Sequence, residues 1–151
     1  MILTPHLLFG AAVGSKIEYM PLTIILAFLS HYLLDLIPHI EYSVANISKK
    51  QWQRAWPDIS RVFLDFSLGM ILILAFAPAG KQIIILSSAL TALIPDGLTI
   101  VSLISPNKLL DKHDQFHRKK VHFLKHKRIP VFLRILSQIL AVVISVFLLK
   151  Y

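Results

Sequence analysis

The stretch Leu29-Ser-His-Tyr-Leu-Leu-Asp-Leu-Ile-Pro-His39 places ionisable side chains at regular intervals at the end of an otherwise apolar run. His31, Asp35 and His39 are four residues apart, so a helix presents them on one face from successive turns. Histidine and aspartate side chains at this spacing are typical of metal ligands. The stretch therefore predicts an apolar helix with a candidate metal site near its end.

The same pattern recurs 57 residues later in the chain. Residues 29–39 align without a gap on residues 86–96, Leu-Ser-Ser-Ala-Leu-Thr-Ala-Leu-Ile-Pro-Asp, and a shorter match lies upstream at an offset of 59. We interpret the repeat as two duplicated helical hairpins, at about residues 2–39 and 59–104. The aligned positions hold metal-capable groups in both copies, His6 with Asp65 and His39 with Asp96.

The composition indicates a membrane protein, because 56% of the residues are hydrophobic and only 16% are charged. Three apolar runs are long enough to cross a bilayer, which takes roughly 20 helical residues. They are Ile59 to Ala77, Ile83 to Ile104 and Pro130 to Leu149. Pro21 to Ile37 is a shorter candidate, and Ile2 to Gly14 is either a short tilted span or a half-helix buried among the others. We predict one all-α domain over residues 1–151, an integral membrane bundle of four to five helices made of the two hairpins and a C-terminal helix at 130–149.

The basic residues predict the orientation in the membrane. Residues 105–129 hold eight Lys and Arg against two Asp, so this one loop supplies +6 of the net charge of +8. Short cytoplasmic loops carry the excess of basic residues. We therefore expect this loop, the loop at 40–58 and the N-terminus on the cytoplasmic side of a bacterial or archaeal plasma membrane, with Lys150 outside if the chain crosses five times.

The chain has no cysteine, so a metal ion would be held by histidine and carboxylate side chains. An ionised carboxylate inside the hydrocarbon costs at least ~2.5 kcal/mol, so such residues are kept where something pairs with them. Asp35, Asp65 and Asp96 all lie within apolar runs, together with His6 and His31. One such acid alone is equally explained by a polar helix contact or by a neutral carboxyl group with a raised pKa. Counted along the predicted helices, these groups lie roughly 10 to 15 Å from the cytoplasmic loops, so we expect them to converge.

The basic loop contains His117-Arg-Lys-Lys-Val-His122, with His113 and His126 on either side. One interpretation is a polybasic segment that attracts anionic lipid, in which the histidines have no special role. In the other, histidines of the segment bind metal and its basic side chains hold phosphate oxygens. The residues concerned are His117 and His122, and Arg118, Lys119 and Lys120. Spacings of four residues in the pairs 113/117 and 122/126 leave the choice of ligating histidines open.

Together these motifs resemble a known family. The helix from Ser30 to His39 resembles the HxxxD...P...H helix of the zinc phospholipase C and single-strand nuclease superfamily. The chain is still more similar to small membrane-bound metal-dependent hydrolases, the YdjM-like group, which combine an N-terminal His, a Ser-His-x-x-x-Asp helix, a Pro-Asp element and a His-Arg-x-x-x-His element. The counterparts here are Pro5 to Leu8, Ser30 to Asp35, Leu93 to Asp96 and His117 to His122. Their order differs from that of the better-known members, which indicates a permuted or separately duplicated relative.

The resemblance implies a membrane-embedded hydrolase with two or three divalent ions, zinc or alternatively manganese, and a metal-activated water as the nucleophile. It implies a bridging role for Asp35, and stabilisation of phosphoryl charge by Arg118 or Lys120. A site just below the cytoplasmic headgroups predicts an amphiphilic phosphoester substrate, such as a phospholipid or a polyprenyl phosphate. The candidate ligands are His6, His31, Asp35, His39, Asp65, Asp96, His117 and His122.

A second class of function fits the same residues. Intramembrane acids, a duplicated hairpin and a basic loop suit a small metal or proton transporter, or a structural or regulatory membrane protein with a metal site. Five short helices are few for a carrier unless the chain forms a homodimer. Nucleic-acid binding by the basic loop is less favoured, because its aromatic residues are only Phe116 and Phe123 and charge alone gives sequence-independent binding. Membrane lipids are the expected partners.

Overall fold

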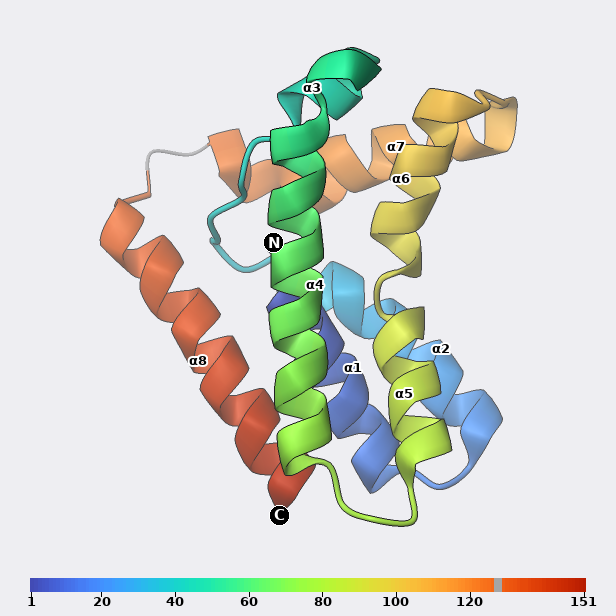
Figure 1. Cartoon of the computed structure of the whole chain (residues 1–151), viewed down its shortest axis with the longest axis vertical. Helices are drawn as coiled ribbons and strands as arrows, with labels where there is room; N and C mark the ends of the chain where they lie inside the picture. The colour runs from blue at the N-terminus through green and yellow to red at the C-terminus, as the bar shows by residue number, and fades with distance from the viewer. Residues whose placement is uncertain (127–128) are drawn as a thin grey trace.

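All secondary structure in the described part of the chain is helical, as the sequence predicts (Figure 1). The computed structural model describes residues 1–126 and 129–151, so the predicted basic-loop residues Lys127 and Arg128 lie outside it, as do the side chains of Phe123, Lys125 and His126. The main helices are α1 Leu3–Lys16, α2 Met20–Asp35, α4 Trp56–Phe76, α5 Gln82–Thr91, α6 Ile94–Ile104, α7 Lys108–Lys120 and α8 Val131–Lys150. The shorter elements are α3 Ala45–Ser48 and two 3-10 turns, Trp52–Arg54 and Val121–His126.

Two helices, α4 and α8, are long and apolar enough to cross a membrane. A third candidate is the pair α5 and α6, which are bent by 46° at the break between them. Pro95 lies in the first turn of α6 and has no backbone N–H, so the hydrogen-bond ladder of α5 cannot continue through this position. α2 is apolar but only 16 residues long. The described residues therefore support two or three crossings and do not confirm four to five, and the continuous helix predicted from Ile83 to Ile104 is wrong, because it is broken in two.

α1 lies at the centre of the bundle, between α4, α5 and α8 (Figure 1). Leu7 and Leu8 of α1 are fully buried. They pack in one apolar cluster with Ile73 of α4, Ile85 of α5 and Leu149 of α8. Of the two alternatives for the first segment, the structure shows the buried helix.

Two glycines bring α1 and α5 close together. A Cβ atom at Gly10 would lie 2.8 Å from the carbonyl oxygen of Ser88, and one at Gly14 would lie 2.9 Å from that of Ile84. Any larger residue would push the two backbones apart, so the small residues permit the approach. His6, one turn before Gly10, is thereby held deep in the bundle.

The predicted basic loop at 105–129 is largely helical instead. α7 begins where the side chain of Asn107 accepts hydrogen bonds from the backbone N–H groups of Leu109 and Leu110, both at 3.0 Å. This arrangement is a helix N-cap. Figure 1 shows α7 running crosswise to α4 and α8. His117 is the buried residue of α7, so this helix brings a histidine into the interior and leaves its basic side chains exposed.

Candidate metal centre

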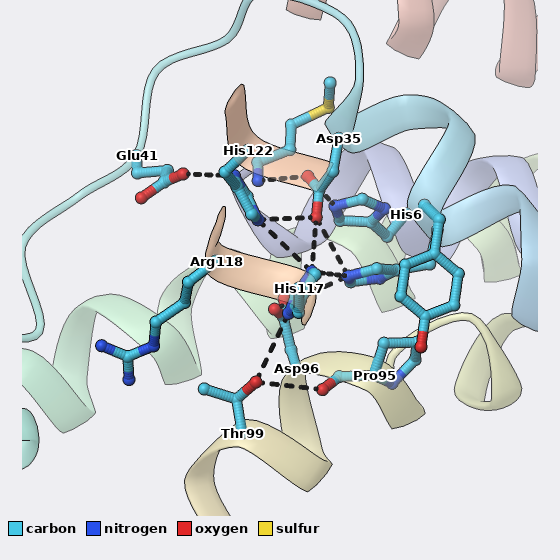
Figure 2. Close-up of polar contacts among 12 residues, drawn as sticks. His6, Asp35, Glu41, Pro95, Asp96, Thr99, His117, Arg118 and His122 are labelled. Carbon is cyan, nitrogen blue, oxygen red and sulfur yellow. Dashed lines mark hydrogen bonds and ion pairs between the residues drawn. The ribbon is translucent and has the colours of Figure 1, made fainter. Parts of the chain in front are cut away.

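Asp35, at the C-terminal end of α2, is surrounded by histidines (Figure 2). Its Oδ2 atom lies 3.0 Å from Nε2 of His117 and 3.1 Å from Nε2 of both His31 and His122. The other carboxylate oxygen, Oδ1, lies 3.2 Å from Nε2 of His6. α1, α2, α7 and the turn at Val121–His126 thus bring five side chains to one place in the interior.

The ring nitrogens in this cluster also face one another. Nε2 of His117 lies 3.2 Å from Nε2 of His31 and 3.3 Å from Nε2 of His122. Two facing imidazole nitrogens share at most one proton, and one carboxylate oxygen has two lone pairs for three rings. A tetrahedral zinc ion with bonds of ~2.0–2.1 Å separates neighbouring ligand atoms by about 3.3 Å. The separations of 3.0, 3.1 and 3.2 Å among the ligand atoms of Asp35, His31 and His117 are therefore close to the edges of such a ligand set.

The Nδ1 atoms of the same three histidines lie close to polar groups outside the cluster. The pairs are His31 with the carbonyl oxygen of Ala92 at 2.8 Å and His117 with Oγ1 of Thr99 at 3.3 Å. Nδ1 of His122 lies 3.0 Å from a carboxylate oxygen of Glu41, an ion-pair distance without hydrogen-bond geometry. An imidazole protonated on Nδ1 keeps the lone pair of Nε2 free for a metal ion. Outer partners of this kind are usual for metal-binding histidines, because they fix the tautomer and the orientation of the ring.

The partner of His31 depends on the helix break. α5 ends at Thr91, and Ala92 follows as its C-terminal cap. The last carbonyl groups of a helix lack partners within the helix, so the Ala92 carbonyl oxygen is available to the imidazole of His31. The break that interrupts the predicted span thus contributes directly to the cluster.

Two overlapping groups of side chains could each hold a metal ion, with ligand atoms within 4.8 Å of one another. One group is His31, Asp35, Asp96 and His117, and the other is Asp35, His39 and His122. Asp35 belongs to both groups and has two oxygens, which suits a carboxylate that bridges two ions. Asp96 is the most accessible of the first group, since its side chain is 30% exposed and its Oδ1 lies 3.6 Å from Nε2 of His31.

His6 lies beside these groups, completely buried and stacked on His31 with 4.0 Å between the ring centroids. Among the described residues, neither of its ring nitrogens has a hydrogen-bond partner, because its approach to Asp35 lacks hydrogen-bond geometry. A buried polar atom without a partner costs about 1–3 kcal/mol, and binding of an ion at Nε2 would remove that cost. The amino group of Met1 also reaches the cluster, at 2.6 Å from Oδ1 of Asp35.

Asp65, a predicted ligand, lies outside the two groups. Its carboxylate accepts hydrogen bonds from the backbone N–H groups of Leu3 at 2.5 Å and Thr4 at 3.2 Å, and from the Thr4 hydroxyl at 2.6 Å. The hydroxyl group of Tyr42 donates a further bond at 3.2 Å. These donors include the first free N–H groups of α1, so Asp65 caps this helix from α4. Asp65 is thus not brought together with the other predicted ligands, and it contacts the start of the helix that carries His6.

The structure also distinguishes the histidines of the basic segment. His117 and His122 face Asp35, whereas Nε2 of His113 lies 2.9 Å from the hydroxyl group of Tyr32. The fourth alternative, His126, has its side chain outside the described part of the chain.

The predicted phosphate-binding residues Arg118, Lys119 and Lys120 are exposed on α7. Arg118 forms an ion pair with Asp114 at 2.7 Å, and its side chain is half exposed. Figure 2 shows it pointing away from Asp35. Lys120 is exposed at the end of α7. Their placement gives no support to the role that the resemblance implies for them.

Sequence reasoning missed Glu41 and Thr99. Glu41 lies 3.0 Å from both Nε2 of His39 and Nδ1 of His122. Its influence on His122 is electrostatic: burial lowers the pKa of His122, but Asp35 and Glu41 outweigh this effect and raise the pKa to about 9.

The sequence contains a signal for each of the two residues. Glu41 is the one acid between Asp35 and Asp58. Thr99 lies three residues after Asp96, which places both on one face of α6.

Comparison with known proteins identifies no relative of this chain. No protein-family model matches the sequence, and neither the curated proteins nor the solved structures contain a significant match. The function is therefore inferred from the geometry of the chain's own residues.

Proposed function

We propose that the protein is a membrane-embedded, metal-dependent hydrolase that cleaves a phosphoester in an amphiphilic substrate. The observation that carries this proposal is the position of one buried carboxylate, that of Asp35, within 3.0–3.1 Å of three imidazole Nε2 atoms. The resemblance to the YdjM-like hydrolases points to the same residues. The donor set of nitrogen and carboxylate oxygen, without thiolate, suits zinc and also manganese.

The residues of the cluster have distinct roles in this proposal. His31, His117 and His122 hold the ions, and Asp35 bridges them. A bound ion would supply a hydroxide nucleophile near neutral pH and polarise a phosphoryl oxygen. Asp96 is the accessible carboxylate of the group, so it is placed to accept the proton of the attacking water.

The position of the cluster along the bundle supports an amphiphilic substrate. Trp52 and Trp56 are exposed at the start of α4, and Tyr19 and Tyr151 are exposed before α2 and after α8. Figure 1 shows the start of α4 at one end of the bundle and the start of α2 and the C-terminus at the other. Such aromatic residues are enriched at the two membrane interfaces. Asp65, which contacts the start of α1, is nine residues into α4 after Trp56, or about 14 Å along the helix. We infer that the cluster lies below the headgroups on the Trp56 side, where the basic residues of α7 attract anionic lipid.

The test is metal analysis combined with hydrolysis assays on the protein in detergent. We expect two ions for each wild-type chain, and zinc- or manganese-dependent hydrolysis of a member of a panel of phospholipids and polyprenyl phosphates. Asp35→Asn should lose both the ions and the activity. Asp58→Asn is the matched control, because Asp58 is equally buried but caps α3 through the N–H groups of Asn46 and Ile47.

Two results would contradict the proposal. Wild-type protein that holds its ions but cleaves no member of the panel would favour a structural metal site. A single ion that exchanges freely, again without hydrolysis, would favour a small metal transporter.

A further inference from the structure

α7 turns one side toward the candidate metal centre and leaves another side uncovered. His113 and His117 are four residues apart and mark the inner side, where Nε2 of His117 lies 3.0 Å from Oδ2 of Asp35. A second set of side chains, at intervals of three, four and three residues, shares another side of the helix. This set, which we call the outer face of α7, is exposed throughout and consists of Leu109, Lys112, Phe116 and Lys119.

The outer face combines large apolar side chains with positive charge. Leu109 is 79% exposed and Phe116 is 53% exposed. In the described part of the chain, neither lysine of this face has an ion-pair partner. The acids of α7, Asp111 and Asp114, lie on a different side together with Arg118, which pairs with Asp114 at 2.7 Å. Negative charge is therefore kept away from the outer face.

The position of α7 in the bundle indicates what covers this face. α4 and α8 are the two candidate membrane spans, and Figure 1 shows α7 crosswise to both, so α7 runs along the plane of the membrane. It lies at the end of the bundle where α4 begins, and Trp52 and Trp56 are exposed there. Exposed tryptophans mark the level of the membrane interface. A helix in this plane with apolar and lysine side chains exposed together is typical of helices that bind an anionic bilayer surface.

We propose that the outer face of α7 binds the anionic surface of a lipid bilayer. Leu109 and Phe116 enter the boundary between headgroups and acyl chains, and Lys112 and Lys119 extend to the lipid phosphates. The lysines and the histidines of the basic segment then act on separate sides of one helix, so lipid attraction and metal binding are compatible. A bilayer fits this face better than a partner protein does, because the face lies at the level of the interface.

Lipid contact is coupled to the metal centre through the same helix. The ring of Phe116 contacts the ring of Tyr32 at 6.0 Å between centroids, and the Tyr32 hydroxyl group lies 2.9 Å from Nε2 of His113. His117 directly follows Phe116 in the chain, so lipid that holds the outer face in place also holds this candidate ligand in place. By linkage, ion binding then strengthens lipid binding to the same degree. This coupling rests on the proposed metal centre, whereas the lipid contact does not.

The first experiment uses the absence of cysteine, which makes an introduced cysteine a unique labelling site. The full chain with Leu109→Cys carries an environment-sensitive dye in nanodiscs of phosphatidylcholine, with and without phosphatidylglycerol. With phosphatidylglycerol present, the dye should emit at a shorter wavelength and be quenched by lipids brominated in the acyl chains. Asp111→Cys is the matched control on the acid-bearing side of α7, and its dye should stay in water. Adding Lys112→Gln and Lys119→Gln to the first variant should remove the effect of phosphatidylglycerol.

The second experiment measures zinc affinity in the same nanodiscs by competition with a chromophoric chelator. Phosphatidylglycerol should tighten zinc binding by the wild type about 5- to 10-fold, the lower end of the usual range of coupling between sites. The variant with Lys112→Gln and Lys119→Gln should lose this increase. The matched control combines Lys49→Gln and Lys50→Gln, which remove two exposed charges near α3 at the same end of the bundle. Zinc that accumulates on anionic lipid affects all three proteins alike, so the comparison isolates α7.

Three results would overturn the inference. A dye at residue 109 that stays in water in both lipid mixtures would exclude a bilayer as the occupant and favour a partner protein. Quenching that is the same with and without phosphatidylglycerol would exclude recognition of anionic lipid. An equal change in zinc affinity in the wild type and in the variant without the two lysines would exclude the coupling. The proposed function fails separately: a chain that holds no ions while the dye at residue 109 is immersed in lipid would refute the metal-dependent hydrolase and leave the lipid-binding face standing.

Discussion

Residues 29–39 and 86–96 have similar sequences, and the helices that they end stop at nearly the same aligned position, α2 at Asp35 and α5 at Thr91. Each has a proline three or four residues beyond that end, at Pro38 and Pro95. After the first, the chain runs without helix along α8. The second proline, Pro95, already lies in the first turn of α6. The repeated pattern thus specifies where a helix stops, and the residues that follow decide where the chain goes.

The two segments contribute different things to the candidate centre. The first supplies side chains, His31 and Asp35. At the aligned positions the second has Ser88 and Ala92, and both contact Gly10 in the interface with α1. The second segment therefore provides close packing, one backbone carbonyl group that binds His31, and the carboxylate of Asp96 at its end. The two similar segments contribute unequally to the candidate centre, because the first supplies three members of the two ligand groups and the second supplies one.

The largest effect is expected when the first segment is made to resemble the second. His31→Ser should lower the affinity for zinc at least about 100-fold, because it removes an imidazole from the ligand set. Ser88→Ala, the change at the aligned position, should leave the affinity unchanged, since the Ser88 hydroxyl bonds only carbonyl groups of its own helix. Competition with a chromophoric chelator measures both. Equal affinities in the two variants would show that the halves are functionally equivalent.

The supporting role of the second segment predicts a loss of stability without a loss of ligands. Gly10→Ala should lower the free energy of unfolding by about 1–3 kcal/mol, because its Cβ would lie 2.7 Å from that of Ala92 and overpacking carries this cost. Gly97→Ala is the control, since a Cβ there meets no atom within 4 Å. Thermal or denaturant unfolding in detergent gives the comparison. A Gly10→Ala variant as stable as the wild type would mean that α1 and α5 are not held in close contact.

A smaller effect is expected from the outer partner of His117. Thr99→Val should lower zinc affinity by about 10-fold, the usual lower bound for loss of a group that orients a ligating histidine. Thr91→Val should have no such effect, because the Thr91 hydroxyl bonds the Ser87 carbonyl oxygen within α5. The same chelator competition applies. If Thr99→Val binds zinc as the wild type does, α6 has no part in orienting His117.

The smallest effect concerns Asp65. Asn at this position keeps one acceptor for the start of α1, so Asp65→Asn should cost about 1 kcal/mol or less of stability and leave the number of bound ions unchanged. Metal analysis together with unfolding decides the point. Loss of a full equivalent of metal would identify Asp65 as a ligand. It would also support the interpretation that both repeats contribute metal ligands at aligned positions.

The parts of the structure that follow from local sequence could be predicted. Apolar runs predicted the helices, and the four-residue spacing of His31 and Asp35 placed both groups on one face of α2. The prediction that the same helix presents His39 is wrong, because α2 ends at Asp35. His117 and His122 could be proposed from their residue types alone. In each case the relevant information lies within one or two helical turns.

The parts that depend on distant contacts could not be predicted. Asp65 meets the start of α1, about 60 residues earlier in the chain, and no pattern around it signals this. Arg118 lies in a basic run that suggests phosphate binding, yet Asp114, one turn away, pairs with it. These residues acquire their roles from tertiary packing.

The crosswise position of α7 bears on how this helix is attached to the rest of the bundle. His117 and His122 come from a segment that follows every other contributor to the cluster in the chain, and that lies across the bundle instead of within it. An ion bound between Asp35 and these two histidines would link α7 and the turn after it to α2, and so attach a surface helix to the helices in the bilayer. Assembly of the centre and closure of the bundle at this end would then be a single event, and removal of the ion would release α7 from the core.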